Sequence, residues 1–578
     1  MVVHQCSGSS AEFTAGPALL EASWVWPSTK HGSMKAACDL RPAGPWNATE
    51  QDMPPPILSA SHAIQASSAG RLRVFLDKLS APEDCCTNVI VVGGSVPCGH
   101  GFPGCGGSKV MFANTTAAGG LPGAWPTWLK RWLDWSRPKC CPSGHVVTNL
   151  CVGATGIDYV LATLRTRVLP RLATSAAHLV LVDTAVNDYN EYFYVKRCQW
   201  RRCISQEEIK RKWQLTQVMA EALIRQLLLL NVSVAFVENA RFRGGDTPNG
   251  YGAWAAHEPV LRHYGVPTVH LGFAAEAAAR ASLPRPELWA REWTHVDGQH
   301  LSAPGHWITA MLFVYGVVCN EWHRIRDDAS RRQPVTQAPL PMPLVSEGQL
   351  EPYIGMLSVP NVIIDFTSKE ISWRDAVVQP AADGARSAQD LESGWVWTRA
   401  VRKAAGGGYA LLPADPTAAA AAQSTDELGK LSFSVRSAKP CSFDVKASFR
   451  TGRLRVGYLR SYEGQASVAM QVFVAVAGGL NATGIPAAEW VINGTWEERV
   501  SIYTSDDFEL SESVQRRIWP ARCGYFRSGR CQRMANVSVG DRWAVPALVR
   551  FTSIPMHLPH LGPEGAWAPF SLYTVASY

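Results

Sequence analysis

The sequence feature that most constrains the fold is a regular alternation of short apolar runs and longer amphipathic segments between residues 88 and 318. Short apolar runs bounded by turn residues predict buried strands, and apolar residues at intervals of three and four predict helices. Strands that alternate with helices predict an α/β fold with a parallel sheet covered on both faces. The predicted strands are 88–92, 146–152, 178–182, 232–237 and 268–271, and the predicted helices are 125–135, 156–169, 207–230, 251–264 and 304–318.

The regions outside this alternation have different patterns. Residues 1–87 have no clear periodicity and predict an irregular N-terminal extension to a first domain at 88–326. Prolines cluster at 327–352 and predict a linker. Residues 353–578 have strand-like patterns and almost no helix-length ones, so they predict a β-rich, sandwich-like domain. Its expected strands are 361–366, 430–435, 442–447, 454–459, 468–476 and 500–503.

Composition narrows the range of partners. The chain has 578 residues and a net charge of +7, with no dense block of lysine and arginine. Such a block is typical of a nucleic-acid-binding segment, so no nucleic-acid partner is expected. No apolar run reaches the ~20 residues of a membrane span, so no transmembrane segment is expected. The sequence indicates no oligomeric state.

Cysteine usage indicates an oxidising compartment. Fifteen cysteines are too many for a typical reduced cytosolic enzyme, and the odd total leaves at least one thiol free or intermolecular. Local spacing favours the pairs Cys98–Cys105, Cys198–Cys203 and Cys523–Cys531, and the doublets Cys85-Cys86 and Cys140-Cys141 are typical of oxidised loops.

Glycosylation sequons also favour the secretory pathway or the extracellular space. The chain has six Asn-x-Ser/Thr sequons, which predict a glycoprotein. The first residues lack the basic start and apolar stretch of a signal peptide. Either the true N-terminus is missing from the sequence, or the protein is cytosolic. The sequons are at Asn47, Asn114, Asn231, Asn481, Asn493 and Asn536.

Three short segments, each at or after the end of a predicted strand, carry the residue types of an acyl-transfer site. The first is Gly93-Gly94-Ser95, in which the glycines allow a sharp turn that brings the serine hydroxyl to the mouth of a pocket. A phosphate-binding loop does not fit, because no Gly-Lys-Ser/Thr follows. The nucleophile elbow Gly-x-Ser-x-Gly fits poorly, because position 97 is proline. The alternative is a plain turn after a strand.

The second and third segments supply an amide and a histidine with a carboxylate. Asn187 can direct its amide at a developing oxyanion, or it can belong to a turn-forming Asn-Asp pair. Asp297 precedes His300 by three residues, a spacing that lets the carboxylate orient the imidazole. The alternatives are a structural histidine and a metal site made by His295, Asp297 and His300.

Taken together, these segments resemble the sequence blocks of the SGNH, or GDSL-like, hydrolases. The first block of that family, Gly-Asp-Ser, is similar to Gly93 to Ser95, with Gly94 in place of aspartate. Its third block, Gly-x-Asn-Asp, is similar to 185–188, with Ala185 in place of glycine. Its fifth block, Asp-x-x-His, matches 297–300. The resemblance covers about residues 88–318 and implies a flavodoxin-like α/β/α domain.

Two further segments complete the resemblance. The second family block supplies a backbone N–H to the oxyanion hole, and the corresponding stretch is 149–156, where the glycine of the family falls on Ala154 with Gly153 beside it. Gly153 is the expected donor. In the β-rich domain, residues 456–463 look like a tail found on algal and protist members of this group.

The resemblance implies a serine esterase. Ser95 is the expected nucleophile, His300 the base and Asp297 the residue that orients it, while the N–H groups of Ser95 and Gly153 and the side chain of Asn187 form the expected oxyanion hole. The expected substrate is an acyl ester, for instance an O-acetyl ester on a carbohydrate, and no cofactor or metal is implied. The alternatives are an O-acyltransferase that uses the same site and a non-catalytic glycan-binding or cell-surface protein.

Overall fold

The chain divides into two compact units. The first comprises residues 1–157, 168–350 and 424–427, and the second comprises 158–167, 351–423 and 428–578. The computed structural model describes residues 33–39, 62–64, 71–99, 123–153, 155–175, 178–188, 206–239, 252–280, 293–294, 300–327, 340–346, 349–350, 363–365, 377–378, 395–402, 409–413, 431–435, 442–449, 453–460, 467–474, 486–493, 502–518, 545–554, 557–558, 566–567 and 570–577.

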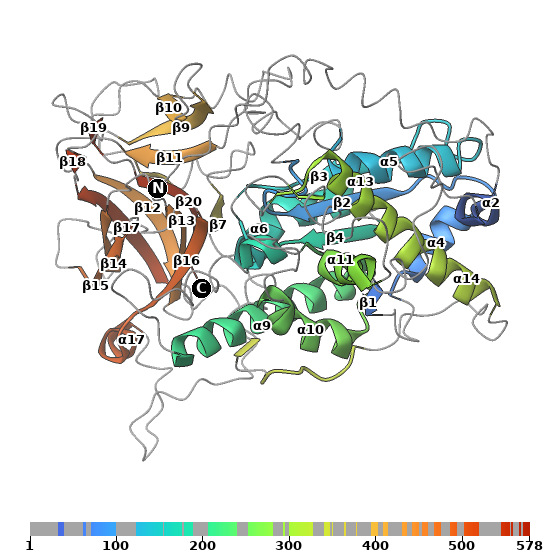
Figure 1. Ribbon diagram of the computed structural model, residues 1–578. Helices are drawn as coiled ribbons and strands as arrows, with labels where there is room; N and C mark the ends of the chain where they lie inside the picture. Colours follow the sequence, from blue (N-terminus) through green and yellow to red (C-terminus); the bar gives the residue numbers. More distant parts are fainter. Residues whose placement is uncertain are drawn as a thin grey trace. The chain divides into compact units, whose positions relative to one another are not determined.

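The first unit is built on a six-stranded sheet with the order β1-β6-β5-β4-β2-β3 (Figure 1). Its last five strands are parallel, and β1 adds to β6 as an antiparallel edge. The parallel strands follow the flavodoxin-like order, in which the chain starts near the middle and the direction of winding reverses between β2 and β4. The strands are β1 (His62–Ile64), β2 (Asn88–Gly93), β3 (Val146–Asn149), β4 (Leu179–Asp183), β5 (Ser233–Glu238) and β6 (Thr268–His270).

Helices cover both faces of this sheet, which confirms the predicted α/β/α architecture. Successive strand residues point to opposite faces. Val89 and Val91 of β2 share one buried cluster with residues of α5 and α13, whereas α9 contacts β5 and packs against α10. Figure 1 shows α9 and α10 on the side of the sheet opposite to α5 and α13. The helices of this unit include α5 (Trp125–Ser136), α7 (Leu169–Ser175), α9 (Gln206–Leu229), α10 (Gly252–Tyr264), α11 (Leu271–Arg280) and α13 (Ala303–Met311).

Part of the segment 1–87 belongs to this unit, although the sequence predicts an irregular extension there. The helix α2 (Met34–Asp39) is joined to the sheet unit by the disulfide Cys38–Cys319 at the end of the π-helix η2 (Leu312–Cys319). The helix α4 (Arg73–Ser80) buries Phe75 in the main cluster. The missing periodicity has a simple cause, because these elements are only three to eight residues long.

The segment 340–346, within the predicted linker, is hydrogen-bonded to α9. The buried carboxylate of Glu221 accepts the backbone N–H groups of Leu344 and Val345 at 2.6 and 3.0 Å. Arg225 donates to the carbonyl oxygen of Pro341 at 2.8 Å. This part of the proline-rich segment therefore packs on the first unit.

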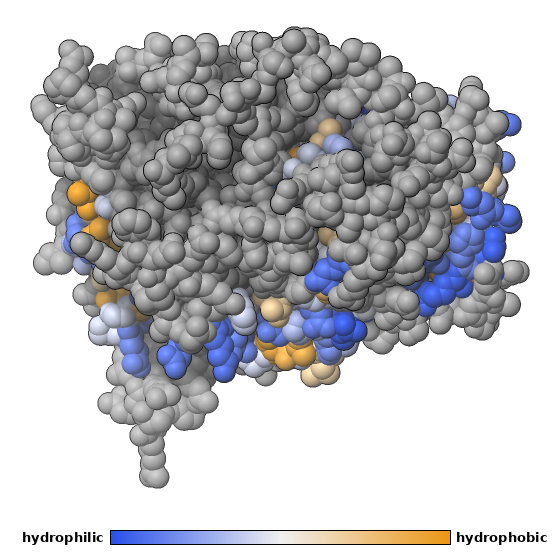
Figure 2. Space-filling model, viewed as in Figure 1, coloured by the Kyte–Doolittle hydropathy of each residue, from blue (hydrophilic) through white to orange (hydrophobic). Residues whose placement is uncertain are grey.

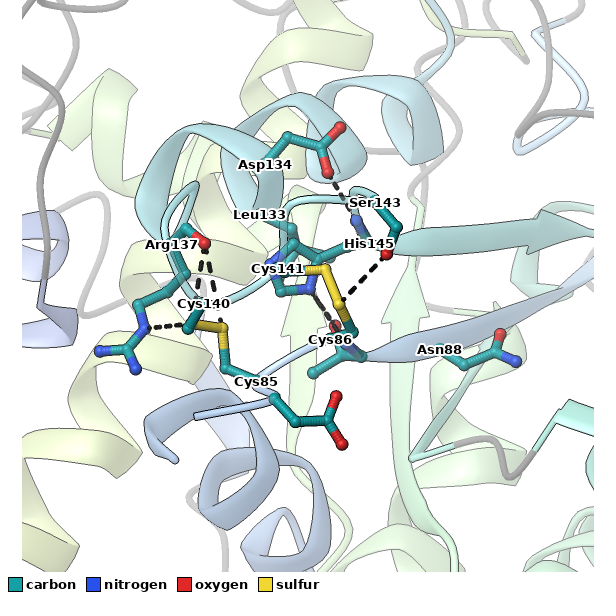
Figure 3. The surroundings of a disulfide bond; sticks show 12 residues. Cys85, Cys86, Asn88, Leu133, Asp134, Arg137, Cys140, Cys141, Ser143 and His145 are labelled. Atoms are coloured by element: carbon teal, nitrogen blue, oxygen red, sulfur yellow. Dashed lines mark hydrogen bonds between the residues drawn. A yellow bond between two sulfur atoms is a disulfide. The ribbon is translucent and has the colours of Figure 1, made fainter. Parts of the chain in front are cut away.

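Two adjacent disulfides lie at the amino-terminal edge of β2 and β3 (Figure 3). Cys85 pairs with Cys140 and Cys86 with Cys141, so the two doublets join each other. Beside them, buried His145 accepts a hydrogen bond from the backbone N–H of Thr87 at 3.1 Å. Burial lowers the pKa of His145 to about 4.

A further disulfide corrects the sequence prediction. Cys98 pairs with Cys151, not with Cys105. The reason is topological: β2 and β3 are parallel neighbours, so the loops that follow them meet at the same edge of the sheet. The predicted pairs Cys198–Cys203 and Cys523–Cys531 lie outside the described residues. The observed disulfides indicate an oxidising compartment.

The second unit consists mainly of antiparallel sheets, as predicted. One has the order β10-β9-β11-β20-β13-β16 with β7 beside β20, and another has the order β15-β14-β17-β12-β8. Trp490 of β15 and Phe508 of β16 lie 5.3 Å apart between ring centroids, so the two sheets meet at these strands. The strands are β7 (Ile363–Asp365), β8 (Val377–Val378), β9 (Trp395–Arg402), β10 (Tyr409–Pro413), β11 (Leu431–Val435), β12 (Ser442–Phe449), β13 (Arg453–Arg460), β14 (Ser467–Val474), β15 (Ala488–Asn493), β16 (Ile502–Glu509), β17 (Val545–Ile554) and β20 (Phe570–Ser577).

One face of the described surface is mainly hydrophilic. On the face in Figure 2, hydrophilic side chains cover most of the described area, with small hydrophobic areas among them. Scattered exposed apolar residues are normal for a protein surface. In the described part of the chain, no helix combines the length and the apolar character needed to span a membrane.

Candidate functional site

Two of the three segments singled out in the sequence directly follow strands at the carboxyl edge of the parallel sheet. Ser95 follows β2 and Asn187 follows β4, and the strand order reverses between these two neighbours. In doubly wound sheets the loops diverge at this switch point and leave a crevice that binds ligands. His300 comes from the segment just before α13.

The turn after β2 is held close to the end of β4. The backbone N–H of Gly94 donates to the carbonyl oxygen of Asp183 at 3.0 Å. A Cβ atom on Gly93 would lie 2.1 Å from that same oxygen, so only glycine fits at position 93. This close approach fixes the position of Ser95, which is buried, with 5% of its surface exposed.

The hydroxyl of Ser95 faces the imidazole of His300. The distance between Ser95 Oγ and His300 Nε2 is 2.9 Å, although the two residues are 205 positions apart in the sequence. At this distance the hydroxyl can donate its proton to the ring when Nε2 is unprotonated. The structure thus brings together the expected nucleophile and the expected base.

Local hydrogen bonds hold the segment that carries His300. Thr294 and Leu301 form an antiparallel bridge, and the N–H of Ser302 donates to the carbonyl oxygen of Trp293 at 3.0 Å. Ser302 then caps α13 by accepting the N–H of Gly305 at 3.2 Å. Asp297, the expected orienting carboxylate, lies between these anchored ends but outside the described residues.

The amide of Asn187 is fixed beside the serine turn. Its Nδ2 atom donates to the carbonyl oxygen of Thr155 at 2.8 Å. An amide nitrogen carries two N–H groups, so this contact uses one and orients the other. A Cβ atom on Gly94 would lie 1.8 Å from Asn187 Nδ2, which shows how tightly the amide packs against the serine turn.

The loop after β3 also packs on the serine turn. The N–H of Val152 donates to the carbonyl oxygen of Gly93 at 2.9 Å, and Asn149 Nδ2 donates to that of Pro97 at 2.7 Å. The disulfide Cys98–Cys151 joins the same two loops covalently. Gly153, the expected oxyanion donor, lies buried in a turn of this loop, and Ala154 is outside the described residues.

A buried carboxylic acid lies beneath the serine turn, and sequence reasoning missed it. Asp183 Oδ2 accepts hydrogen bonds from Trp125 Nε1 and from Asn239 Nδ2, both at 2.9 Å. Burial raises the pKa of Asp183 to about 7 and outweighs these two hydrogen bonds, which lower it. The signal in the sequence was an acidic residue at the end of an apolar run.

A second buried polar cluster lies behind Asn187. His257 of α10 is fully buried between two carboxylates: its Nδ1 lies 2.7 Å from Glu238 Oε1 and its Nε2 lies 3.3 Å from Asp188 Oδ2. Burial lowers the pKa of His257, but Glu238 and Asp188 outweigh it and raise the pKa to about 10. Among the described residues, no cluster of histidine, cysteine or acidic side chains is arranged to hold a metal ion.

No protein-family model and no curated protein matches the chain. Solved structures give distant similarities. One is a two-domain esterase active on acetylated mannans, with 15% sequence identity, coverage of 90% of this chain and 97% of that chain, and a TM-score of 0.47. An acetylxylan esterase from Geobacillus stearothermophilus has 16% identity, coverage of 41% and 95%, and a TM-score of 0.29. A lipase/acylhydrolase from Enterococcus faecalis has 15% identity, coverage of 41% and 97%, and a TM-score of 0.26.

These similarities are too distant to decide an activity. What the site can do chemically follows from its own side chains: a buried serine within hydrogen-bond distance of a histidine, and a fixed amide beside the turn that carries the serine.

Proposed function

We propose that this protein is a carboxylic ester hydrolase that uses Ser95 as its nucleophile. The observation that carries the proposal is the 2.9 Å distance between Ser95 Oγ and His300 Nε2 at the switch point of the sheet. Fold alone would not support an activity, because one fold hosts many functions. A hydroxyl paired with an imidazole beside an aligned amide, however, is a constellation with a definite chemistry.

In the proposed mechanism, His300 accepts the proton of Ser95 as Oγ attacks the ester carbonyl. Asp297 orients His300 and stabilises the imidazolium that forms. The backbone N–H groups of Ser95 and Gly153 and the side chain of Asn187 bind the oxyanion. His300 then returns the proton to the leaving alcohol, and water, activated by the same imidazole, releases the acyl group and restores the serine.

For the substrate we propose an acyl ester of a carbohydrate, with acetyl as the first acyl group to test. The support is the resemblance of the three sequence segments to the SGNH hydrolases. If a sugar hydroxyl replaced water in the second step, the same side chains would perform acyl transfer. Turnover of an activated acetate that depends on a sugar acceptor, with negligible hydrolysis in its absence, would favour the transferase.

The test is labelling and kinetics on the full chain. We expect a fluorophosphonate probe to label Ser95 and p-nitrophenyl acetate to be hydrolysed. Ser95→Ala should remove the labelling and lower kcat by roughly 10³-fold or more, with a melting temperature within a few degrees of the wild type, because the substitution removes only one hydroxyl. Ser143→Ala, at an exposed serine outside the site, is the matched control. Folded wild-type protein that neither reacts with the probe nor hydrolyses the ester would contradict the proposal.

A further inference from the structure

The side chains of Asn187 and Asp188 bind the same short loop at two points. Asn187 Nδ2 donates to the carbonyl oxygen of Thr155 at 2.8 Å, and Asp188 Oδ1 accepts the N–H of Ile157 at 2.8 Å. Both residues are themselves held in a turn, since their backbone N–H groups donate to the carbonyl oxygen of Thr184 at 3.0 Å. A shift of Asp188 would therefore move Asn187 and the loop together.

Behind Asp188, the buried histidine His257 contacts two carboxylates at once. Both ring nitrogens of His257 face carboxylate oxygens, of Glu238 at one side and Asp188 at the other. A neutral imidazole has one N–H group, whereas the imidazolium has two. The protonated ring hydrogen-bonds Glu238 through Nδ1 and places its charge 3.3 Å from Asp188 Oδ2, an ion-pair distance without hydrogen-bond alignment.

The other groups to consider around His257 are one aromatic ring and one more acidic residue. The rings of Phe236 and His257 are in T-shaped contact, with centroids 5.8 Å apart. Asp183, at the end of the neighbouring strand β4, is the next acidic group, and it interacts with Glu238 rather than with His257. Glu238 and Asp188 outweigh the effect of burial and keep the pKa of His257 high, so the ring stays protonated at neutral pH.

We infer that His257, held by Glu238, is a positioning residue that fixes Asp188 and through it the oxyanion-binding amide of Asn187. Neither His257 nor Glu238 touches the reacting groups; their effect reaches the reaction through Asp188 and the 155–157 loop. The inference rests on the proposed function, since it assigns the device that aligns one of the proposed donors. It differs from a general structural role in one respect: its effect on the rate must depend on Asn187.

A double-mutant cycle tests this dependence. His257→Gln keeps a polar side chain but removes the charge and replaces two nitrogens on opposite sides of the ring with a single amide nitrogen, so it cannot face both carboxylates with a donor nitrogen as the ring does. We expect it to lower kcat for p-nitrophenyl acetate by about 10- to 100-fold, less than the ~10²–10³-fold loss typical of deleting an oxyanion donor, with KM changed less than about threefold. In the Asn187→Ala background, the same substitution should change kcat less than about threefold, because sites that act through one another are not additive.

The matched control is His270→Gln. His270 is also a buried histidine, at the end of the adjacent strand β6, but it stacks on Phe273 at 4.0 Å between centroids, and burial lowers its pKa to about 3. Its substitution should affect stability, and any effect on kcat should be the same with and without Asn187. This control separates general damage to the core from misalignment of the amide.

Each outcome has a distinct meaning. Equal losses from His257→Gln in the wild-type and Asn187→Ala backgrounds would overturn the positioning role and leave the esterase proposal intact. If His257→Gln does not give folded protein, Glu238→Gln, which keeps size and a hydrogen-bond acceptor, is placed in the same cycle, with an expected three- to tenfold loss of kcat that disappears without Asn187. An inactive wild type would instead overturn the proposed function itself.

Discussion

At the scale of single residues, Gly94 is explained by its neighbour. The SGNH pattern that segment 93–95 resembles has aspartate at this position, and this chain has glycine. The structure supplies the reason, because the Asn187 amide occupies the space in which a Cβ atom of residue 94 would lie. Glycine at position 94 and the position of the Asn187 amide therefore depend on each other.

We predict that Gly94→Ala lowers kcat by about 10²–10³-fold, the cost of one lost oxyanion donor. The new methyl group would lie 1.8 Å from Asn187 Nδ2 and 2.8 Å from the carbonyl oxygen of Thr155, so the amide must move. Overpacking of this kind should also cost about 1–3 kcal/mol of stability. Steady-state kinetics and thermal melts measure both effects.

The control for this prediction is the same substitution in an Asn187→Ala background. There the closest collision is absent and only the contact with the carbonyl oxygen of Thr155 at 2.8 Å remains, so Gly94→Ala should cost less stability than in the wild type and should not lower kcat further. An unchanged kcat in Gly94→Ala alone would show that the Asn187 amide does not need its observed position.

Sequence reasoning located the residues that carry recognisable chemistry and missed the ones that support them. Ser95, Asn187 and His300 could be chosen because each follows a predicted strand or precedes a predicted helix. Asp183 and His257 could not, because their partners come from distant elements of the fold. An acidic residue at the end of an apolar run looks like an ordinary strand end until the neighbouring strand is known.

At the scale of elements, the loops after β2 and β3 act as one unit. The disulfide Cys98–Cys151 joins them, and the hydrogen bond from Asn149 to Pro97 lies beside it. These loops carry the proposed nucleophile and the proposed backbone donor, so their relative position matters for the reaction.

We predict that Cys98→Ser/Cys151→Ser destabilises the first unit by about 3 kcal/mol. The loss is smaller than the 53-residue separation suggests, because Cys86–Cys141 already closes most of that loop. We also expect a lower kcat, since the tether between the two loops is gone. Urea denaturation and ester hydrolysis measure the two effects. A variant that loses stability but keeps full activity would show that hydrogen bonds alone align the loops.

The strands of the first unit were predictable because both faces of the sheet are covered. Continuous apolar runs mark β2, β4 and β5 within a residue or two of their ends. In the second unit, the pattern did not predict β17, although this strand pairs on both sides. Arg550 interrupts its apolar run, and its partner Asp444 lies directly opposite on β12, with contacts of 2.8 and 2.9 Å. A local pattern cannot show such a cross-strand pair.

At the scale of the whole molecule, four buried titratable groups of the first unit shape the pH dependence of its stability. His145 and His270 have lowered pKa values of about 4 and 3, so below about pH 6.5 the unfolded chain binds protons that the folded chain does not. Asp183 and His257 have raised pKa values of about 7 and 10, so the folded chain binds the extra protons from about pH 3.8 to 7 and from about pH 6.5 to 10.

We predict from these four groups a stability maximum near pH 6.5. Below pH 6.5, His145 and His270, whose pKa values are lowered, make the unfolded chain bind two more protons, whereas Asp183 makes the folded chain bind only one more. The free energy of unfolding therefore falls as pH decreases. On the alkaline side, the stabilisation from the His257 cation is lost as pH rises towards 10. Each proton that one state binds and the other does not changes the free energy of unfolding by about 1.4 kcal/mol per pH unit. Melting temperatures recorded from pH 4 to 10 test the prediction.

Asp183→Asn is the control for the pH dependence. It removes the proton that Asp183 binds in the folded chain between about pH 3.8 and 7. In a plot of stability against pH, the slope below pH 6.5 should therefore become steeper, while the slope above pH 7 should not change. Because Asp183 belongs to the first unit, the melting transition whose pH dependence changes in this variant is the unfolding of that unit. Stability that continues to rise above pH 7 would contradict the assignment of His257 as a buried cation.

The disulfide Cys38–Cys319 has a consequence for how the protein is made. Its cysteines are 281 residues apart, whereas those of the other three observed disulfides are 53 to 55 apart. At translation rates of about 5–20 residues per second, the partner of Cys38 emerges on the order of 15 to 60 s later. During that interval Cys85, Cys86 and Cys98 all appear, and each can capture the waiting thiol. Correct biosynthesis should therefore depend on thiol–disulfide exchange that releases such premature bonds.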